Sequence, residues 1–220
     1  MTSVSWFKRN NYCDGSKTPL MRGIFHSCMS FIIMFFLITY GKLLITLKFI
    51  SMVMIFSSYL ASSVFHCVGL PAEKEMIMNL IDHVAIHHHI YGTMLCFYHF
   101  NINLILVHFL YLLNYLFDVI DLCIYRHDYI HSNKHVWHYV FSIALSFFNL
   151  LNYLIYSIYV NTGKIVLFVL SGSLYITGMV IFCCNMKKSK TAHHLWSFHE
   201  TFHLFTILGT SIMLYVILSY

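Results

Sequence analysis

The sequence has very little charge. Aspartate, glutamate, lysine and arginine together make up 10% of its 220 residues, whereas hydrophobic residues make up 59%. A soluble protein needs many more polar side chains to cover its surface, so the composition excludes a soluble globular domain. The net charge of +5 is a signal of membrane topology, because basic residues gather on one side of a membrane protein. It gives no indication of a nucleic-acid surface. We therefore predict an integral membrane protein.

Proline and paired cysteines are scarce as well. The seven cysteines are odd in number and include no C-x-x-C pair, which excludes a disulfide framework and a thiolate metal site. With only two prolines, no internal repeat and no low-complexity tail, nothing separates the chain into independent parts. We expect a polar, basic, cytosolic segment at 1–23 and a single membrane domain at 24–220.

Long apolar runs take up nearly the whole chain instead. Seven runs of about 20 residues are each long enough to cross a hydrocarbon core of ~30 Å as a helix. They cover 24–41, 49–68, 77–98, 102–124, 138–160, 164–185 and 200–220. We therefore expect an all-α integral membrane protein, a seven-transmembrane helix bundle.

The basic residues predict the direction of each helix. Most lysines and arginines lie in the N-terminal segment and in the even-numbered loops, which face one side of a seven-span protein. Because cytosolic loops carry the excess of Lys and Arg, the N-terminus is expected in the cytosol. The second span then ends in the cytosol, whereas the third and seventh spans begin there. Residues near 66, 82 and 199–203 are thus expected at one membrane depth.

Two short motifs at that depth carry the residues of a metal site. Ser62 and His66 are four residues apart, as are His199 and His203, so each pair lies on one helix face. Imidazole is costly inside a bilayer unless it has a partner. Three neutral imidazoles suit zinc and leave the fourth tetrahedral position for water. The motifs predict a catalytic zinc site held by His66, His199 and His203.

Two further polar residues are expected to complete this site. Zinc lowers the pKa of its bound water toward ~7, which makes hydroxide available near neutral pH. Asp82, at the mouth of the third span, is in a position to orient that water or to take its proton. The hydroxyl of Ser62, one turn from His66, can bond a ligand, the water or a developing oxyanion.

In these segments the chain resembles the haemolysin III family, which is related to the progestin and adipoQ receptors and, more distantly, to the alkaline ceramidases. The resemblance implies a seven-helix fold with zinc beside Ser62 and Asp82. The sequence departs from the family pattern in the first helix. There His26 is a candidate match for a family histidine, but the threonine before it and an acidic residue further upstream are missing. The motifs that carry the resemblance are Ser62–His66, Ile81–Ile86, Ile90–Thr93, Gly172–Gly178 and His199–Phe205.

Three consecutive histidines in the third span cannot all face the bundle interior, because neighbouring helical residues point about 100° apart. His89 lies seven residues beyond Asp82, nearly on the same face and roughly 10 Å deeper. A proton relay is one interpretation of His89, and a hydrogen bond to a neighbouring helix is the other. We expect His87 and His88 to bond neighbouring helices or to reach the interface.

Four more histidines precede the fifth span, at His127, His131, His135 and His138. If this segment is helical they form a stripe that could bind a second metal or sense pH. Their charged and polar neighbours favour an ordinary solvated connector. Asp118 and Asp121, near the same surface, are most simply interfacial polar groups.

The sequence leaves three functions open, all with membrane lipids as partners. A zinc site within a helical bundle favours a hydrolase that acts on a lipid amide or ester. The family resemblance also implies a pore-forming, cytolytic protein, although a pore needs a polar lining through the outer half as well. An adipoQ-type receptor would need an extracellular ligand surface, and the expected outer loops are very short.

We predict that residue 2 lies in the cytosol and residue 220 on the opposite side of the membrane. The distribution of Lys and Arg and the odd number of expected spans both require this. The measurement is protease accessibility of tags placed at residues 2 and 220 in sealed vesicles. Cleavage of both tags from the same side would contradict the topology.

Overall fold

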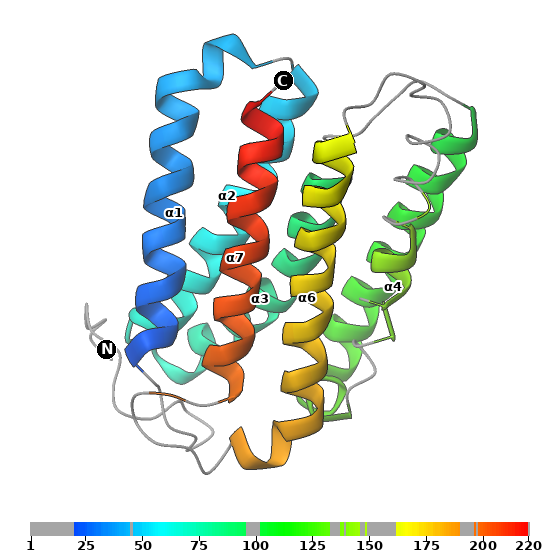
Figure 1. Cartoon of the computed structure of the whole chain (residues 1–220). Helices are drawn as coiled ribbons and strands as arrows, with labels where there is room; N and C mark the ends of the chain where they lie inside the picture. The colour runs from blue at the N-terminus through cyan, green and yellow to red at the C-terminus, as the bar shows by residue number, and fades with distance from the viewer. Residues whose placement is uncertain are drawn as a thin grey trace.

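Long helices lying side by side make up the fold (Figure 1). The computed structural model describes residues 20–44, 46–95, 102–132, 137–138, 140–145, 148, 162–189, 196 and 198–219. Residues 137–138, 140–145 and 148 are also helical. The principal helices are α1 (Leu20–Tyr40), α2 (Thr46–Cys67), α3 (Ala72–Leu95), α4 (Ile102–Ser132), α6 (Thr162–Ser189) and α7 (Phe198–Leu218), with a 3-10 helix η1 (Gly41–Leu43) after α1.

Among the residues that the structure describes, four helices are long and apolar enough to cross a membrane: Met21–Leu43, Leu47–Cys67, Ile165–Phe182 and Phe198–Leu218. Their outer faces expose large apolar side chains such as Phe35 and Ile38, which are 62% and 76% accessible. Such surfaces suit contact with lipid rather than with water. The chain is an integral, multi-pass membrane protein. The full count of seven spans and the cytosolic N-terminus remain predictions, and most of the expected fifth span, 138–160, lies outside the described residues.

Some helices extend beyond the expected apolar runs. Helix α1 begins at Leu20 rather than at 24, and it includes Arg22, which pairs with a buried glutamate instead of facing water. Helix α4 continues to Ser132, eight residues past the expected end at 124. Apolarity alone set the expected ends, whereas a helix continues wherever its polar side chains find partners or solvent.

The chain turn between α2 and α3 follows from local chemistry. Pro71 lacks a backbone N–H and therefore stands just before the first turn of α3, where its carbonyl accepts a hydrogen bond from the Glu75 N–H at 2.8 Å. Glu73 and Glu75 lie in that first turn, where negative charge is favourable at the positive end of the helix dipole. This turn sets where α3 begins beside the end of α2.

The helices pack in close pairs. The most extensive contacts join α6 to α7, α2 to α3 and α1 to α2, and α1 also touches α7. A side chain at Gly92 would place its Cβ 2.9 Å from the Ser51 carbonyl oxygen, so the missing side chain lets α2 and α3 approach closely. The main core joins α1, α2 and α7 through Met29, Ile33, Met52, Ile55, Leu214 and Ile217. Three buried histidines of these helices lie at one end of that core.

Candidate metal centre

Three buried histidines from three helices meet at one end of the bundle. His26 lies in the second turn of α1, His66 in the last turn of α2 and His203 in the second turn of α7. Helices α1 and α7 begin at this end and α2 ends there, so the three residues reach the same level (Figure 1). Their possible ligand nitrogens lie within 4.8 Å of one another. Such spacing allows one ion to contact all three.

The surroundings of these imidazoles fit a cation. Within the part of the chain that the structure describes, both ring nitrogens of His26 and Nε2 of His203 are buried and meet no hydrogen-bond partner. Leaving a buried polar atom unpaired costs ~1–3 kcal/mol, so such atoms are rare unless something binds them. Neutral imidazole nitrogen is a preferred ligand of zinc, and three such ligands leave one tetrahedral position open. The residues present therefore fit a zinc ion.

His199, the third ligand expected from the sequence, lies beside this group. Its ring stacks on that of His203, with centroids 4.5 Å apart, and its centroid is 6.4 Å from that of His66. The structure thus brings His66, His199 and His203 together and adds His26 as a fourth imidazole. His26 has no histidine partner four residues away, so helical spacing did not reveal it. Two signals in the sequence concerned it, an imidazole inside an apolar run and the candidate match of His26 to a family histidine.

Asp82 and Ser62 form a fixed carboxylate next to the histidines. The Ser62 hydroxyl of α2 donates a hydrogen bond to Oδ1 of Asp82, which lies in α3. The other carboxylate oxygen, Oδ2, lies 3.8 Å from Nε2 of His66. One oxygen is therefore held by the serine while the other faces the imidazoles. This is a suitable arrangement for a general base.

His89 lies further along α3 in a network of hydroxyl groups. Tyr59 lies between His89 and the histidine centre, with its ring centroid 5.4 Å from that of His89 and 5.6 Å from that of His26. The Tyr59 hydroxyl is 2.7 Å from Oγ1 of Thr210. These neighbours connect His89 with the centre. Its ring nitrogens contact hydroxyls from three helices, Ser58 at 3.1 Å, Tyr175 at 2.9 Å and Thr210 at 3.3 Å.

A buried ion pair joins the two helices that begin at this end. Nε of Arg22 in α1 donates to Oε1 of Glu200 in α7 at 2.7 Å, and the Glu200 side chain is fully buried. Arg22 lies one turn before His26, and Glu200 follows His199 directly. The pair therefore holds α1 and α7 together beside the histidines. Sequence reasoning did not connect these residues, because their charges lie 178 positions apart.

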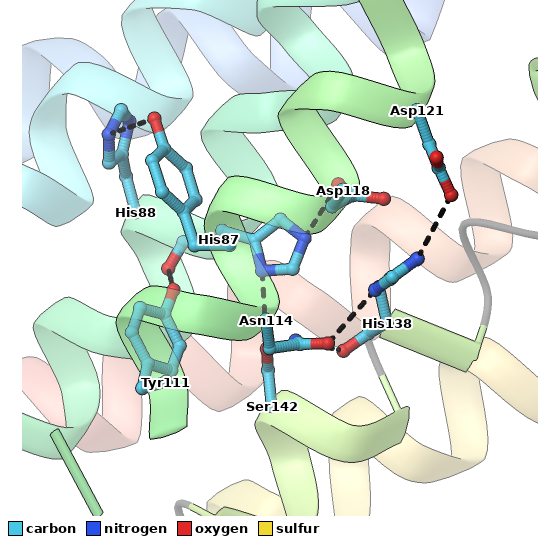
Figure 2. Close-up of polar contacts among 9 residues, drawn as sticks. His87, His88, Tyr111, Asn114, Asp118, Asp121, His138 and Ser142 are labelled. Carbon is cyan, nitrogen blue, oxygen red and sulfur yellow. Dashed lines mark hydrogen bonds and ion pairs between the residues drawn. The ribbon is translucent and has the colours of Figure 1, made fainter. Parts of the chain in front are cut away.

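The remaining histidines considered from the sequence lie elsewhere. His87 and His88 bond residues of α4, Asp118 at 2.8 Å and the Tyr115 hydroxyl at 3.4 Å, as expected for contacts with a neighbouring helix (Figure 2). His138 also contacts residues of α4. The side chains of the other members of the stripe, His127, His131 and His135, lie outside the described residues.

A family model described as haemolysin-III related matches residues 16–214. The match includes every helix from α1 to α7 except the last residues of α7, and all four imidazoles of the centre. No curated protein matches the chain.

We predict that Arg22→Met destabilises the protein by about 3–5 kcal/mol, because it removes the charged partner that the buried Glu200 carboxylate has in α1. The double variant Arg22→Met, Glu200→Met should recover most of that loss, since neither charge remains. Thermal unfolding in detergent micelles measures both. Lys42→Met, at an exposed lysine of η1, serves as the control. A double variant no more stable than Arg22→Met would contradict the role of the pair.

Proposed function

Because the chain belongs to the haemolysin-III-related family of membrane proteins, we propose that its histidine centre binds zinc and hydrolyses an amide or ester bond of a membrane lipid. One observation carries the proposal: buried imidazoles with unpaired nitrogens lie beside a carboxylate that a serine holds in place. A metal accounts for the unpaired nitrogens, and the carboxylate supplies the base that hydrolysis requires.

The metal ligands that we propose are His66, His203 and a third imidazole. His66 and His203 belong both to the set expected from the sequence and to the group with nitrogens within 4.8 Å. Two residues compete for the third position. His26 has the shorter spacing, whereas His199 shares a helix face with His203 and stacks on it. Three ligands, rather than four, keep a position open for the reaction.

The residues around the centre can carry the proton transfers of hydrolysis. Bound zinc supplies Lewis acidity and makes hydroxide available near neutral pH. Asp82 takes the proton of the attacking water on Oδ2, while the Ser62 hydroxyl holds Oδ1. The same carboxyl then gives that proton to the leaving nitrogen or oxygen. His89 is proposed as a proton relay that connects through Thr210 and the Tyr59 hydroxyl.

A lipid is the proposed substrate because the centre lies within a multi-pass membrane protein. The outer surfaces of the spanning helices are apolar, as shown by exposed residues such as Phe31, Phe35 and Ile38. Molecules that reach these helices from the side are therefore those dissolved in the bilayer. An amide or ester near the headgroup can approach a site at one end of the bundle without leaving the membrane.

We predict about one zinc ion per chain, and less than a tenth of that amount in either His66→Ala or His203→Ala. Elemental analysis of the purified protein measures it. Loss of the metal should also lower the unfolding temperature, since a ligand that binds only the folded state stabilises that state. Comparison of His26→Ala with His199→Ala identifies the third ligand, as only one of these variants should lose the metal. Stoichiometric zinc in the His66→Ala, His203→Ala double variant would refute the site.

A cytolytic, pore-forming protein is the second candidate function. The description of the matching family, haemolysin-III related, favours it. The two functions make different demands on Asp82. Hydrolysis needs its carboxylate as a base, whereas a pore depends on helix packing and on the groups that line it.

We predict that Asp82→Asn lowers hydrolysis of a ceramide-like lipid by at least ~100-fold, a typical contribution of a general base. Zinc should stay bound, because Asp82 is not one of the proposed ligands. Dye release from vesicles that contain the protein should not change. The two assays are run in parallel on the native protein and the variant. Dye release from both proteins with hydrolysis from neither would favour the cytolytic function.

A further inference from the structure

His26 differs from His203 in how many of its ring nitrogens lack a partner. Among the residues that the structure describes, both Nδ1 and Nε2 of His26 are buried without a hydrogen-bond partner, whereas His203 has one such nitrogen, Nε2. His26 is only 4% exposed. One ion contacts one nitrogen of each imidazole that binds it. A single ion therefore accounts for His203 but leaves one nitrogen of His26 without a partner.

The nitrogen of His26 that an ion leaves over is a hydrogen-bond donor. A neutral imidazole carries one N–H group and one lone pair that accepts. A metal ion takes a lone pair, so the N–H remains whether or not His26 binds the ion. A histidine that holds a metal usually donates its other N–H to a carboxylate, a carbonyl or water. No described residue accepts a hydrogen bond from the His26 ring, so the geometry requires an acceptor oxygen from elsewhere.

Aromatic rings hold the His26 side chain in place. Its ring stacks on that of His66 with centroids 5.6 Å apart and meets the His203 ring edge-on at 4.3 Å. The Tyr59 ring lies 5.6 Å away, while the Tyr59 hydroxyl is 2.7 Å from Oγ1 of Thr210. Rings of α2 and α7 thus fix the imidazole without using its nitrogens. A donor fixed in advance stabilises a developing charge without a cost of reorganisation.

The His26 ring also lies close to the proposed base. A ligand nitrogen of His26 is within 4.8 Å of those of His66 and His203. Oδ2 of Asp82 is 3.8 Å from Nε2 of the same His66. A carbonyl group that water attacks beside Asp82 therefore has His26 among its neighbours.

His26 has two roles open to it, and they exclude each other. As the third metal ligand it would direct its lone pair at the ion and its N–H elsewhere, because the two ring nitrogens point in different directions. His199 can fill the ligand position instead. It shares a helix face with His203, and the two rings already stack with centroids 4.5 Å apart. With His199 as the ligand, the N–H of His26 can face the reacting group.

We propose that His26 is a catalytic residue that donates its N–H to the carbonyl oxygen of the lipid amide or ester, while His199 is the third metal ligand. This role rests on the proposed hydrolysis. The oxygen of water bonds to the carbonyl carbon, and the electron pair of the C=O bond moves to the carbonyl oxygen, where His26 stabilises the negative charge. Asp82 takes the proton of the water. It passes that proton to the leaving nitrogen or oxygen as the C–N or C–O bond breaks and the carbonyl forms again.

A permanently bound water is the other acceptor that would satisfy His26, and it would give the residue a structural role. A structural role predicts a lower unfolding temperature in His26→Leu. A substrate contact predicts an unfolding temperature equal to or higher than that of the native protein, because leucine removes buried nitrogens that lack partners. Thermal unfolding of the zinc-loaded, substrate-free proteins in micelles measures this difference.

Zinc content and hydrolysis test the catalytic role in the full-length protein. His26→Leu should keep about one zinc ion per chain, whereas His199→Ala should lose the metal. Hydrolysis of a ceramide-like lipid by His26→Leu should fall by about 10²–10³-fold in kcat with little change in KM. This is the effect of removing one donor to an oxygen that gains charge only in the transition state.

Binding of an inhibitor provides a measurement that needs no turnover. In a phosphonate analogue of the lipid, a tetrahedral phosphorus with charged oxygens stands in for the attacked carbonyl carbon. Its dissociation constant, measured by titration calorimetry in micelles, should rise in His26→Leu by about the factor by which kcat falls. His26→Asn and His26→Gln each place an amide N–H near one of the two imidazole nitrogens. One of these two variants should regain about tenfold or more of the lost affinity and kcat.

His88→Leu is the matched control, since it removes an imidazole of α3 that contacts Tyr115 in α4. It should leave zinc content, hydrolysis and inhibitor binding unchanged. Loss of zinc in His26→Leu would overturn the proposal and make His26 the third ligand. Unchanged hydrolysis and inhibitor binding in His26→Leu would overturn the role of His26 and leave the hydrolase function in place. Absence of hydrolysis by the native protein would overturn both.

Discussion

Every polar side chain buried among these apolar helices must find a partner within the protein, and this constraint shapes the bundle more than any other. No water replaces a missing hydrogen bond in the hydrocarbon region. Arg22 therefore pairs with Glu200 across two helices, and serine and threonine hydroxyls return to carbonyls one turn earlier, as Ser30 does with His26. Among the described residues, the buried nitrogens of His26 and Nε2 of His203 lack such partners, and they lie at the candidate metal centre.

Helix α3 serves two polar centres that lie on different faces. Asp82 and His89 face α2, α6 and α7, where Ser62 holds the carboxylate and hydroxyl groups surround the imidazole. His87 faces α4 and bonds Asp118. Near the C-terminal end of α3, Gly92 lets α3 approach α2 closely. These polar residues make α3 less hydrophobic than its neighbours, although each of them has a defined partner.

The positions at which α1, α2 and α7 begin or end along the bundle decide which residues form the candidate metal centre. Because α1 and α7 begin where α2 ends, residues near these ends meet although the sequence separates them widely. The ion pair between Arg22 and Glu200 keeps α1 beside α7 at this level. The candidate ligands are thereby positioned by helices rather than by loops, which suits a site whose geometry must be held within narrow limits.

The sequence by itself determined the membrane class, the helical segments around the motifs and the gathering of His66, His199, His203, Asp82 and Ser62. Composition, the length of apolar runs and i, i+4 spacing are local properties, so they can be recognised in the sequence without a structure. Only the tertiary structure brought His26 into the centre, paired Arg22 with Glu200 and placed His87 against Asp118. Each of these contacts joins different helices, and the rotation of one helix against another depends on packing that no single segment encodes.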